Sequence, residues 1–221
     1  MHRNVVIICN GEFPKTEYPL YLVASADILV CCDGAFEKYL SEMEGIFHRK
    51  RLPEVVIGDL DSLPEKLRME YEDIIVKVDE QEYNDQTKAF RWVMDNVGGP
   101  CSISIIGATG LREDHTIGNV SLLMEYARMY DLESLGADVR IVSDYGTIFA
   151  ITDTFEMECG PGRRVSIFSP DNSLNIKSTG LEYKTDDVVF DNWWKATLNK
   201  STQDKVRLEF SHKSIALVML D

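Results

Sequence analysis

The sequence predicts an α/β protein with two domains: a mostly parallel three-layer α/β domain over residues 1–140, then an antiparallel β-sandwich domain over residues 141–221. In the first part, short apolar runs alternate with helical stretches, which indicates a parallel sheet with helices on both faces. In the second part, short β-rich runs are divided by Gly, Pro, Asn and Asp turns, and no helical period appears. The pattern changes near Leu135–Asp138, so we expect the boundary within roughly five residues of Asp144.

The composition is that of a soluble globular protein. Of 221 residues, 44% are hydrophobic and 27% are charged. The net charge of −14 argues against general binding to nucleic acid or to an anionic membrane, since both need a basic surface. The apolar run Val5–Cys9 is too short for a signal sequence or a membrane span, so we expect a cytoplasmic protein. The five cysteines form no CxxC pair and are expected to be reduced core residues.

Strands and helices alternate in the first part. The expected strands are Val5–Cys9, Ile28–Cys32, Val55–Ile57, Ile74–Val78 and Ile103–Ile106. The expected helices are Pro19–Ala26, a stretch that runs through Leu40, Glu65–Tyr71, residues 84–97 and His115–Tyr130. Within residues 84–97, Phe90, Val93 and Val97 recur at the spacing of one buried helix face.

The second part is predicted to contain short strands alone. Its β-rich runs are Val139–Val142, Thr147–Thr152, Arg164–Phe168, Leu174–Ile176, Val188–Phe190, Val206–Phe210 and Ile215–Leu220. Their spacing is typical of an antiparallel sandwich or barrel.

The stretch Val55–Ser62 is the main sequence feature from which function is predicted. A buried strand ends in glycine, and Asp59 and Asp61 follow. Residues two apart on an extended chain point to the same side, so both carboxylates would lie beyond the strand's carboxyl end, where open parallel sheets bind ligands. Two such carboxylates favour a cation between them, and hard oxygen ligands suit Mg²⁺. The alternative is a solvated acidic turn, and Ser62 with Glu65 fits a capping box.

A second polar segment begins the predicted helix 84–97. Asp85 and Lys88 lie at i and i+3 at its N-terminus, so both can face one ligand. The helix dipole also favours an acid there, so Asp85 could equally be a cap, and Lys88 could lie on a solvated face.

A glycine-rich turn, Gly107–Gly110, follows the strand Ile103–Ile106. Such a turn directs backbone N–H groups toward an anion, and Arg112 could donate two hydrogen bonds to phosphate oxygens. The structural alternatives are an N-cap for Asp114 and a capping or core position for His115.

Several motifs together resemble one family. They are Asp33-Gly34, Gly58-Asp59-Leu60-Asp61-Ser62, Asn84-Asp85-Gln86-Thr87-Lys88, and Gly107 to His115 with Asn119. In order and spacing they resemble thiamine pyrophosphokinases, and Ser178–Tyr183 extends the resemblance over nearly the whole chain. The resemblance implies an N-terminal α/β domain, a C-terminal β-sandwich, and a homodimer with active sites between subunits. It also implies transfer of the pyrophosphoryl group of ATP to thiamine, which gives thiamine diphosphate and AMP.

The resemblance further implies roles for individual residues. The catalytic residues would be Asp59, Asp61, Asp85, Lys88 and Arg112, with Asp59, Asp61 and Asp85 as ligands of Mg²⁺. The ATP-binding residues would be Asp33, Gly34, Gly58, Asp59, Ser62, Thr87, Lys88, Gly107, Thr109, Gly110, Arg112, Asp114, His115 and Asn119. The thiamine-binding residues would be Gln81, Asp85, Tyr183, Trp193, Trp194 and Asn199. Thiamine is a cation, which aromatic rings suit, although Tyr183, Trp193 and Trp194 could equally be core residues.

The chain departs from the family pattern at three places. Asp33–Glu37 reads Asp-Gly-Ala-Phe-Glu where the family usually has Asp-Gly-Gly-Ala-Asn, Asn84 replaces a common threonine, and Leu198-Asn199 replaces a Ser-Asn pair. Two other functions therefore stay open. A related pyrophosphokinase could use another alcohol as acceptor, and a non-catalytic protein could bind a nucleotide or thiamine phosphate. The second would be expected to lack an aspartate of the metal set, and none is missing.

Overall fold

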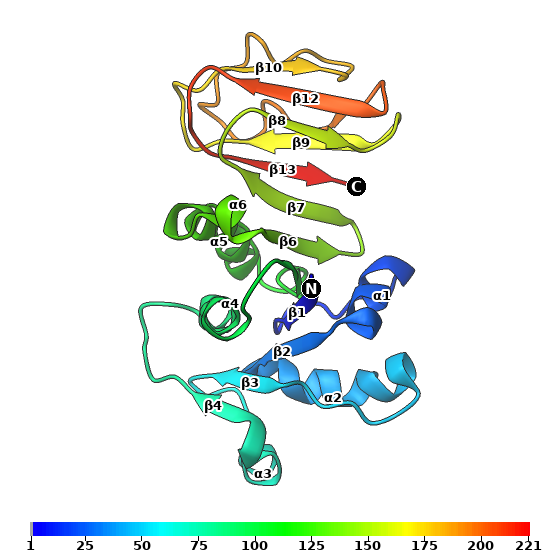
Figure 1. Cartoon of the computed structure of the whole chain (residues 1–221), viewed down its shortest axis with the longest axis vertical. Helices are drawn as coiled ribbons and strands as arrows, with labels where there is room; N and C mark the ends of the chain where they lie inside the picture. The colour runs from blue at the N-terminus through cyan, green and yellow to red at the C-terminus, as the bar shows by residue number, and fades with distance from the viewer. Residues whose placement is uncertain (1) are drawn as a thin grey trace. The chain divides into compact units, whose positions relative to one another are not determined.

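The computed structural model describes residues 2–221, which form two compact units (Figure 1). One unit contains the residues up to Leu122 together with Asp131–Asp144, and the other contains Leu123–Tyr130 and Tyr145–Asp221. The first is an α/β unit and the second is mostly antiparallel, which confirms the predicted fold class. Within residues 2–221, no helix combines the length and the apolar character needed to cross a membrane.

The first unit is built on a parallel sheet. Its strands, in spatial order, are β4 (Ile75–Lys77), β3 (Val55–Gly58), β2 (Ile28–Cys32), β1 (Arg3–Ile8), β5 (Cys101–Ile106) and β6 (Ala137–Ser143). At the centre, Val6 of β1 is in register with Leu29 of β2 and Ser104 of β5. The strand order reverses between β1 and β5, and open sheets bind ligands beyond the carboxyl ends of the strands at such a point.

Helices connect these strands. They are α1 (Glu17–Ser25), α2 (Asp33–Phe47), α3 (Glu65–Glu70), the 3₁₀ turn η1 (Glu72–Ile74), α4 (Asp85–Asn96), α5 (Glu113–Met129) and α6 (Leu132–Leu135). Figure 1 shows α4 on one side of β1 to β3, with α1 and α2 on the other. Because both faces are covered, β3 is buried along its length, which explains its continuous Val and Ile run. In α4, Phe90 and Val93 are buried, as the helical spacing predicts.

The second unit contains two layers of antiparallel strands. One consists of β7 (Gly146–Ile151), β13 (Ala216–Leu220), β9 (Arg164–Phe168) and β11 (Asn199–Lys200), and the other of β10 (Ile176–Thr179), β12 (Lys205–Phe210) and β8 (Phe155–Glu158). In β12, Val206, Leu208 and Phe210 are buried and alternate with exposed residues. They share one core with Phe149 and Val218 of the first layer. This is the packing of a sandwich.

The structure corrects some predicted elements. Val139–Val142, which the sequence groups with the antiparallel runs, lies in β6 and pairs parallel to β5. Its polar and apolar residues alternate, and this alternation alone does not distinguish a parallel strand from an antiparallel one. Val188–Phe190 forms no strand, and only Phe190 is buried there. The strands β8 and β11 are not predicted.

Candidate active site

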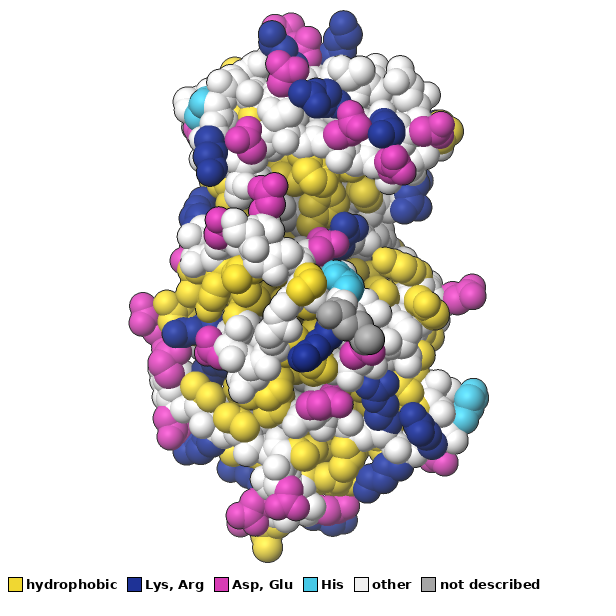
Figure 2. All heavy atoms as spheres, viewed as in Figure 1, with side chains coloured by type: hydrophobic (Ala, Val, Ile, Leu, Met, Phe, Trp, Pro, Cys, Tyr) yellow, Lys and Arg dark blue, Asp and Glu magenta, His cyan; other side chains and the backbone are white. Residues whose placement is uncertain are grey.

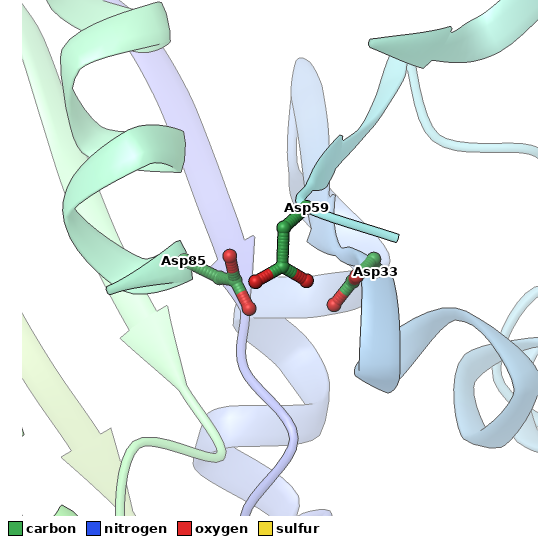
Figure 3. Close-up of side chains that lie close together, drawn as sticks. All are labelled: Asp33, Asp59 and Asp85. Atoms are coloured by element: carbon green, nitrogen blue, oxygen red, sulfur yellow. The ribbon is translucent and has the colours of Figure 1, made fainter. Parts of the chain in front are cut away.

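Three carboxylates converge at the carboxyl edge of the parallel sheet. Asp33 directly follows β2, Asp59 directly follows β3, and Asp85 is the first residue of α4. One carboxylate oxygen from each residue lies within 4.8 Å of the other two (Figure 3). Figure 3 shows the three side chains pointing toward one another from these separate elements. Like charges this close favour a proton or a cation among them.

The backbone near Asp59 determines which aspartates meet. A Cβ atom at Gly58 would lie 2.5 Å from Asp33 Cγ, so glycine permits the close approach of Asp33. Leu60 has a φ of 72°, and the Asp61 N–H donates to Asp59 Oδ1 at 3.1 Å. The chain is therefore not extended from Asp59 to Asp61, and the argument from an extended chain for placing both carboxylates on one side does not apply. Asp61 is exposed and lies outside the cluster of three.

Asp33 is buried, with an exposed fraction of 1%. Its Oδ1 accepts the Gly34 N–H, and among residues 2–221 its Oδ2 is the buried side-chain oxygen or nitrogen that lacks a hydrogen-bond partner. Burial and then the Asp85 charge raise the pKa of Asp33 to about 6. The pKa of Asp59 is lowered, mainly by the hydrogen bond from the Asp61 N–H. An unpartnered buried oxygen facing two further carboxylates fits a hard cation such as Mg²⁺.

The first turn of α4 brings a positive charge to the cluster. Lys88 is 6% exposed, and its Nζ lies 3.2 Å from Asp85 Oδ1, so the alternative of a solvated lysine is wrong. Asn84, rather than Asp85, caps the helix, which leaves Asp85 available to the cluster. Gln81 Nε2 lies 3.5 Å from Asp59 Oδ2. The buried ammonium group offsets part of the negative charge collected at this edge.

The glycine-rich turn after β5 is held against the loop that follows β1. Gly107 and Gly110 have positive φ values of 67° and 99°. The Gly11 N–H donates to the Gly107 carbonyl at 2.6 Å, and the Glu12 N–H donates to the Thr109 carbonyl at 2.8 Å. A Cβ atom at Gly110 would lie 2.5 Å from Glu12 Cβ, so the close approach requires glycine. These bonds fix the turn at the point where the strand order reverses.

Arg112 and His115 both contact Asp114 on the surface. The Arg112 guanidinium donates to the Asp114 carboxylate through Nε at 3.1 Å and Nη2 at 2.5 Å. His115 Nδ1 lies 3.0 Å from the same carboxylate, and all three side chains are exposed. Chiefly through Arg112, these contacts lower the pKa of Asp114. His115 is therefore not a core histidine, and the Nε and Nη2 atoms of Arg112 are engaged by Asp114.

The remaining residues expected at ATP occupy varied positions. Ser62 is exposed, and Pro64 is at the N-cap of α3, so the predicted capping box of Ser62 and Glu65 does not form. Thr87 is fully buried in α4. A Cβ atom at Gly34 would lie 2.5 Å from Asn10 Nδ2. Asn119 is buried, with its amide bonded to protein groups.

Comparison with known proteins is in keeping with this arrangement. The model of the thiamin pyrophosphokinase catalytic domain matches residues 20–133, and the model of the thiamin pyrophosphokinase substrate-binding domain matches residues 146–217. The chain belongs to the thiamin pyrophosphokinase family.

Individual family members are distant in sequence and similar in fold. Thiamine pyrophosphokinase 1 of Oryza sativa subsp. japonica is 24% identical over 209 residues, which cover 83% of this chain and 74% of that protein. Thiamine pyrophosphokinase 3 of the same plant is 28% identical over 134 residues, which cover 53% of this chain and 49% of that protein. The structure of thiamin pyrophosphokinase from Candida albicans matches with a TM-score of 0.76 at 18% identity, covering 99% of this chain and 88% of that chain. The last match establishes the shared fold.

In the family's substrate-binding domain, the aromatic residues expected at thiamine are exposed. The exposed fractions are 64% for Tyr183, 46% for Trp193 and 68% for Trp194, so the alternative of core residues is wrong. Asn199 is 4% exposed, and both ends of its amide are bonded to the Tyr183 backbone, at 3.0 Å to the N–H and 2.6 Å to the carbonyl. Asn199 therefore holds the Tyr183 segment in place, and the aromatic rings remain accessible.

Sequence reasoning placed Asp33 at ATP and did not include it in the metal set. A signal was present, because Asp33 follows β2 as Asp59 follows β3, and Cys32 is in register with Ile57 in these neighbouring parallel strands. Residues that directly follow two paired neighbouring strands, as Asp33 and Asp59 do, lie side by side. The burial of Lys88 left no comparable signal, since it depends on how α4 packs against the sheet.

Proposed function

We propose that this protein transfers the pyrophosphoryl group of ATP to the hydroxyl of thiamine, giving thiamine diphosphate and AMP. The observation that carries the proposal is the convergence of Asp33, Asp59 and Asp85 in a chain of the thiamin pyrophosphokinase family. The presence of matches to both the catalytic and the substrate-binding domain supports it further.

In this reaction the hydroxyethyl oxygen of thiamine bonds to the β-phosphorus of ATP. The bond from that phosphorus to the oxygen bridging the α-phosphate breaks, AMP leaves with this oxygen, and the hydroxyl proton is released. Catalysis of such transfers consists mostly of positioning and charge neutralisation. The protein must therefore supply positive charge along the triphosphate and a carboxylate within hydrogen-bond reach of the hydroxyl.

The residues proposed to hold Mg²⁺ are Asp59, Asp85 and Asp33, with exposed Asp61 joining them when Mg-ATP binds. When bound, Mg²⁺ would neutralise charge on the triphosphate. The unpartnered Oδ2 of Asp33 and the hard donor set support this assignment. One aspartate of the set would also orient the alcohol and accept its proton.

Lys88 and Arg112 provide the protein's own positive charge in this proposal. Lys88 is fixed by its contact with Asp85, so it acts from one place at little entropic cost. Arg112 is exposed and would donate two hydrogen bonds from its planar guanidinium to phosphate oxygens, either beside Asp114 or in its place. Backbone N–H groups of the Gly107–Gly110 turn would complete the phosphate site.

Thiamine is proposed to bind against Tyr183, Trp193 and Trp194. Exposed aromatic rings attract a cation most strongly when the ligand also removes water from them. Gln81 and Asp85 are proposed to contact the reacting hydroxyl. Asn199 would act on thiamine indirectly, through its two hydrogen bonds to the Tyr183 backbone.

A homodimer is proposed as the functional assembly, with ATP and thiamine as the small-molecule partners. The net charge of −14 disfavours a nucleic-acid partner. On the face shown in Figure 2, Lys and Arg side chains are interspersed with Asp and Glu. That mixed surface supports small-molecule chemistry over binding of a polyanion.

The test is to incubate the protein with Mg-ATP and thiamine and to quantify AMP, ADP and thiamine diphosphate. The proposal expects AMP and thiamine diphosphate in equal amounts, dependent on Mg²⁺. AMP formed only with a different alcohol would support a related pyrophosphokinase. Binding of nucleotide without any product would support a non-catalytic protein, and either result would reject the proposal.

A further inference from the structure

We propose that Asn119 is a positioning residue that fixes the distance between the Gly107–Gly110 turn and the aspartate cluster. This deepens the proposed function and rests on it, since the cluster is taken to be the cation site. Asn119 lies on α5 and is 8% exposed. None of the hydrogen bonds found among residues 2–221 joins its side chain to Asp59 or Lys88. Its role follows from what its amide joins.

The Asn119 side chain connects two segments of the site. Its Nδ2 donates to the Ala108 carbonyl at 2.8 Å, within the glycine-rich turn. Its Oδ1 accepts from Asn84 Nδ2 at 2.9 Å, at the N-cap of α4. Its backbone carbonyl accepts from Gln86 Nε2 at 3.1 Å, one residue after Asp85. Asn119 is thus bonded to residues on both sides of Asp85 in the chain.

These bonds form a directional chain. Asn84 Oδ1 accepts the Thr87 N–H at 3.0 Å, while Asn84 Nδ2 donates to Asn119. The order is therefore Thr87 N–H to Asn84, Asn84 to Asn119, and Asn119 to the Ala108 carbonyl. Each of the two side chains must donate at one end and accept at the other, which an amide does and a carboxylate does not. Because the Asn119 amide and the Ala108 carbonyl are buried, loss of either partner leaves an unsatisfied group.

The position of Asp85 depends on this chain. Asp85 lies between Asn84 and Gln86, both of which are bonded to Asn119, and it is the residue through which α4 joins the cluster. Removing the Asn119 amide breaks the side-chain link between Asn84 and the turn, and leaves the start of α4 held to residue 119 by the Gln86 bond to its backbone carbonyl. The separation of the Asp85 carboxylate from Asp33 and Asp59 would then vary, and a cation that needs all three oxygens at once would bind less tightly.

Two variants separate positioning from capping and from general stability. Asn119→Ala removes both side-chain bonds. Asn84→Ser keeps a good N-cap for Thr87 but is too short to reach Asn119, so it breaks the chain at its exposed end. Asn96→Ala is the matched control, because Asn96 also carries an exposed amide on α4 and bonds only its own helix, to Trp92.

The experiment measures Mn²⁺ affinity by electron paramagnetic resonance without nucleotide or thiamine, together with thermal midpoint and turnover. Asn119→Ala and Asn84→Ser should each weaken Mn²⁺ binding by roughly three- to tenfold, about 0.7–1.4 kcal/mol, and the double variant should be no weaker than the poorer single one. Asn96→Ala should bind as the wild type does. In turnover, kcat should fall more than the thiamine KM rises.

The proposal is overturned if folded Asn119→Ala binds Mn²⁺ within twofold of the wild type, or if the two effects are fully additive. If Asn119→Ala does not fold, Asn84→Ser alone decides by the same criterion. A wild-type protein that makes no thiamine diphosphate, but whose Mn²⁺ affinity responds as described, would reject the proposed reaction and retain the positioning role.

Discussion

The carboxyl edge of the parallel sheet and the aromatic surface of the second unit are built in opposite ways. At the sheet edge, charged groups are buried, with exposed fractions of 1% for Asp33 and 6% for Lys88. On the aromatic surface, Tyr183 and Trp194 are more than 60% exposed, and the polar residue Asn199 is buried and fully bonded. At the sheet edge, Asp33 Oδ2 is buried and has no hydrogen-bond partner. On the aromatic surface, the rings of Tyr183 and Trp194 are exposed to solvent.

This difference indicates what each region contributes and what it costs. A buried carboxylate held close to two others, as Asp33 is, destabilises the fold while no cation is bound. This loss of stability would be the cost of a cation site. Exposed rings contribute little to the fold and gain when a ligand covers them. Substitutions at the sheet edge should therefore change both activity and stability, while substitutions on the aromatic surface should change affinity alone.

The largest effect is expected at the cluster. Asp59→Asn or Asp85→Asn should lower turnover at limiting Mg²⁺ by on the order of a hundredfold, about 2.7 kcal/mol, because an amide is a poorer ligand for a hard cation. The protein should remain folded. Asp95→Asn, exposed near the other end of α4, is the control. Near-normal turnover of either cluster variant would mean that the substituted aspartate is not a ligand of the catalytic cation.

The cost of the cluster should appear as a pH dependence of stability. Asp33 has a folded-state pKa raised to about 6, so the folded state keeps a proton that the unfolded state loses near its ordinary pKa. The contribution of Asp33 to stability without metal should therefore fall as pH rises from about 4 to 6, by on the order of 1–3 kcal/mol. Asp33→Asn should remove this loss and be the more stable protein at pH 7.5. Urea unfolding with a chelator at pH 4.5 and 7.5 measures the difference, and equal stability at pH 7.5 would contradict it.

On the aromatic surface, at least one of Trp193→Ala and Trp194→Ala should raise the thiamine KM by about tenfold to thirtyfold, or roughly 1–2 kcal/mol. The ATP KM and the thermal midpoint should stay near wild type, since both rings are exposed. Phe190→Ala, in the core of the same unit, should instead cost roughly 3–5 kcal/mol of stability. Two folded tryptophan variants with normal thiamine KM would shift the acceptor site to Tyr183 and its neighbours.

Substitution of Arg112 tests the exposed part of the proposed phosphate site. Arg112→Lys keeps the charge but loses the two-point grip, so kcat/KM for ATP should fall by roughly tenfold, about 1.4 kcal/mol. Steady-state kinetics at saturating thiamine measures it. Unchanged kcat and ATP KM would mean that Arg112 stays with Asp114 during the reaction.

The smallest effect is expected at Ser62. A capping serine would cost about 1 kcal/mol on replacement by alanine. Because Pro64 is at the N-cap of α3, Ser62→Ala should change the free energy of unfolding by less than about 0.5 kcal/mol. A larger loss by urea unfolding would indicate that the serine supports the fold after all.

The parts of the fold that could be predicted from sequence are those set by local pattern. The runs in β2 and β3 are continuous because both faces of the sheet are covered, and α4 shows its buried face as a regular spacing. Asp59 and Asp85 could be identified because each begins a segment after a predicted strand. By contrast, β8 was missed because its alternation spans only four residues.

The remaining details of the site depend on conformation and packing that the sequence does not display. Leucine rarely adopts a positive φ, so nothing in the sequence indicates the turn at Leu60 between Asp59 and Asp61. The entry of Asp33 into the cluster depends on the register of β2 with β3, and the burial of Lys88 on the packing of α4. The sequence does show that Asp33 follows a predicted strand as Asp59 does, but the strand register and the helix packing are properties of the assembled sheet.

The central claim is that Asp33, Asp59 and Asp85 form the cation site of the protein without substrate. Titration of Mn²⁺ into the nucleotide-free protein, followed by electron paramagnetic resonance, tests it most directly on the wild type, Asp33→Asn, Asp59→Asn and Asp61→Asn. We predict tight binding to the wild type, a loss of at least about tenfold, or 1.4 kcal/mol, for Asp33→Asn and Asp59→Asn, and a smaller loss for Asp61→Asn. Loss of binding in Asp61→Asn with wild-type affinity in Asp33→Asn would contradict the account.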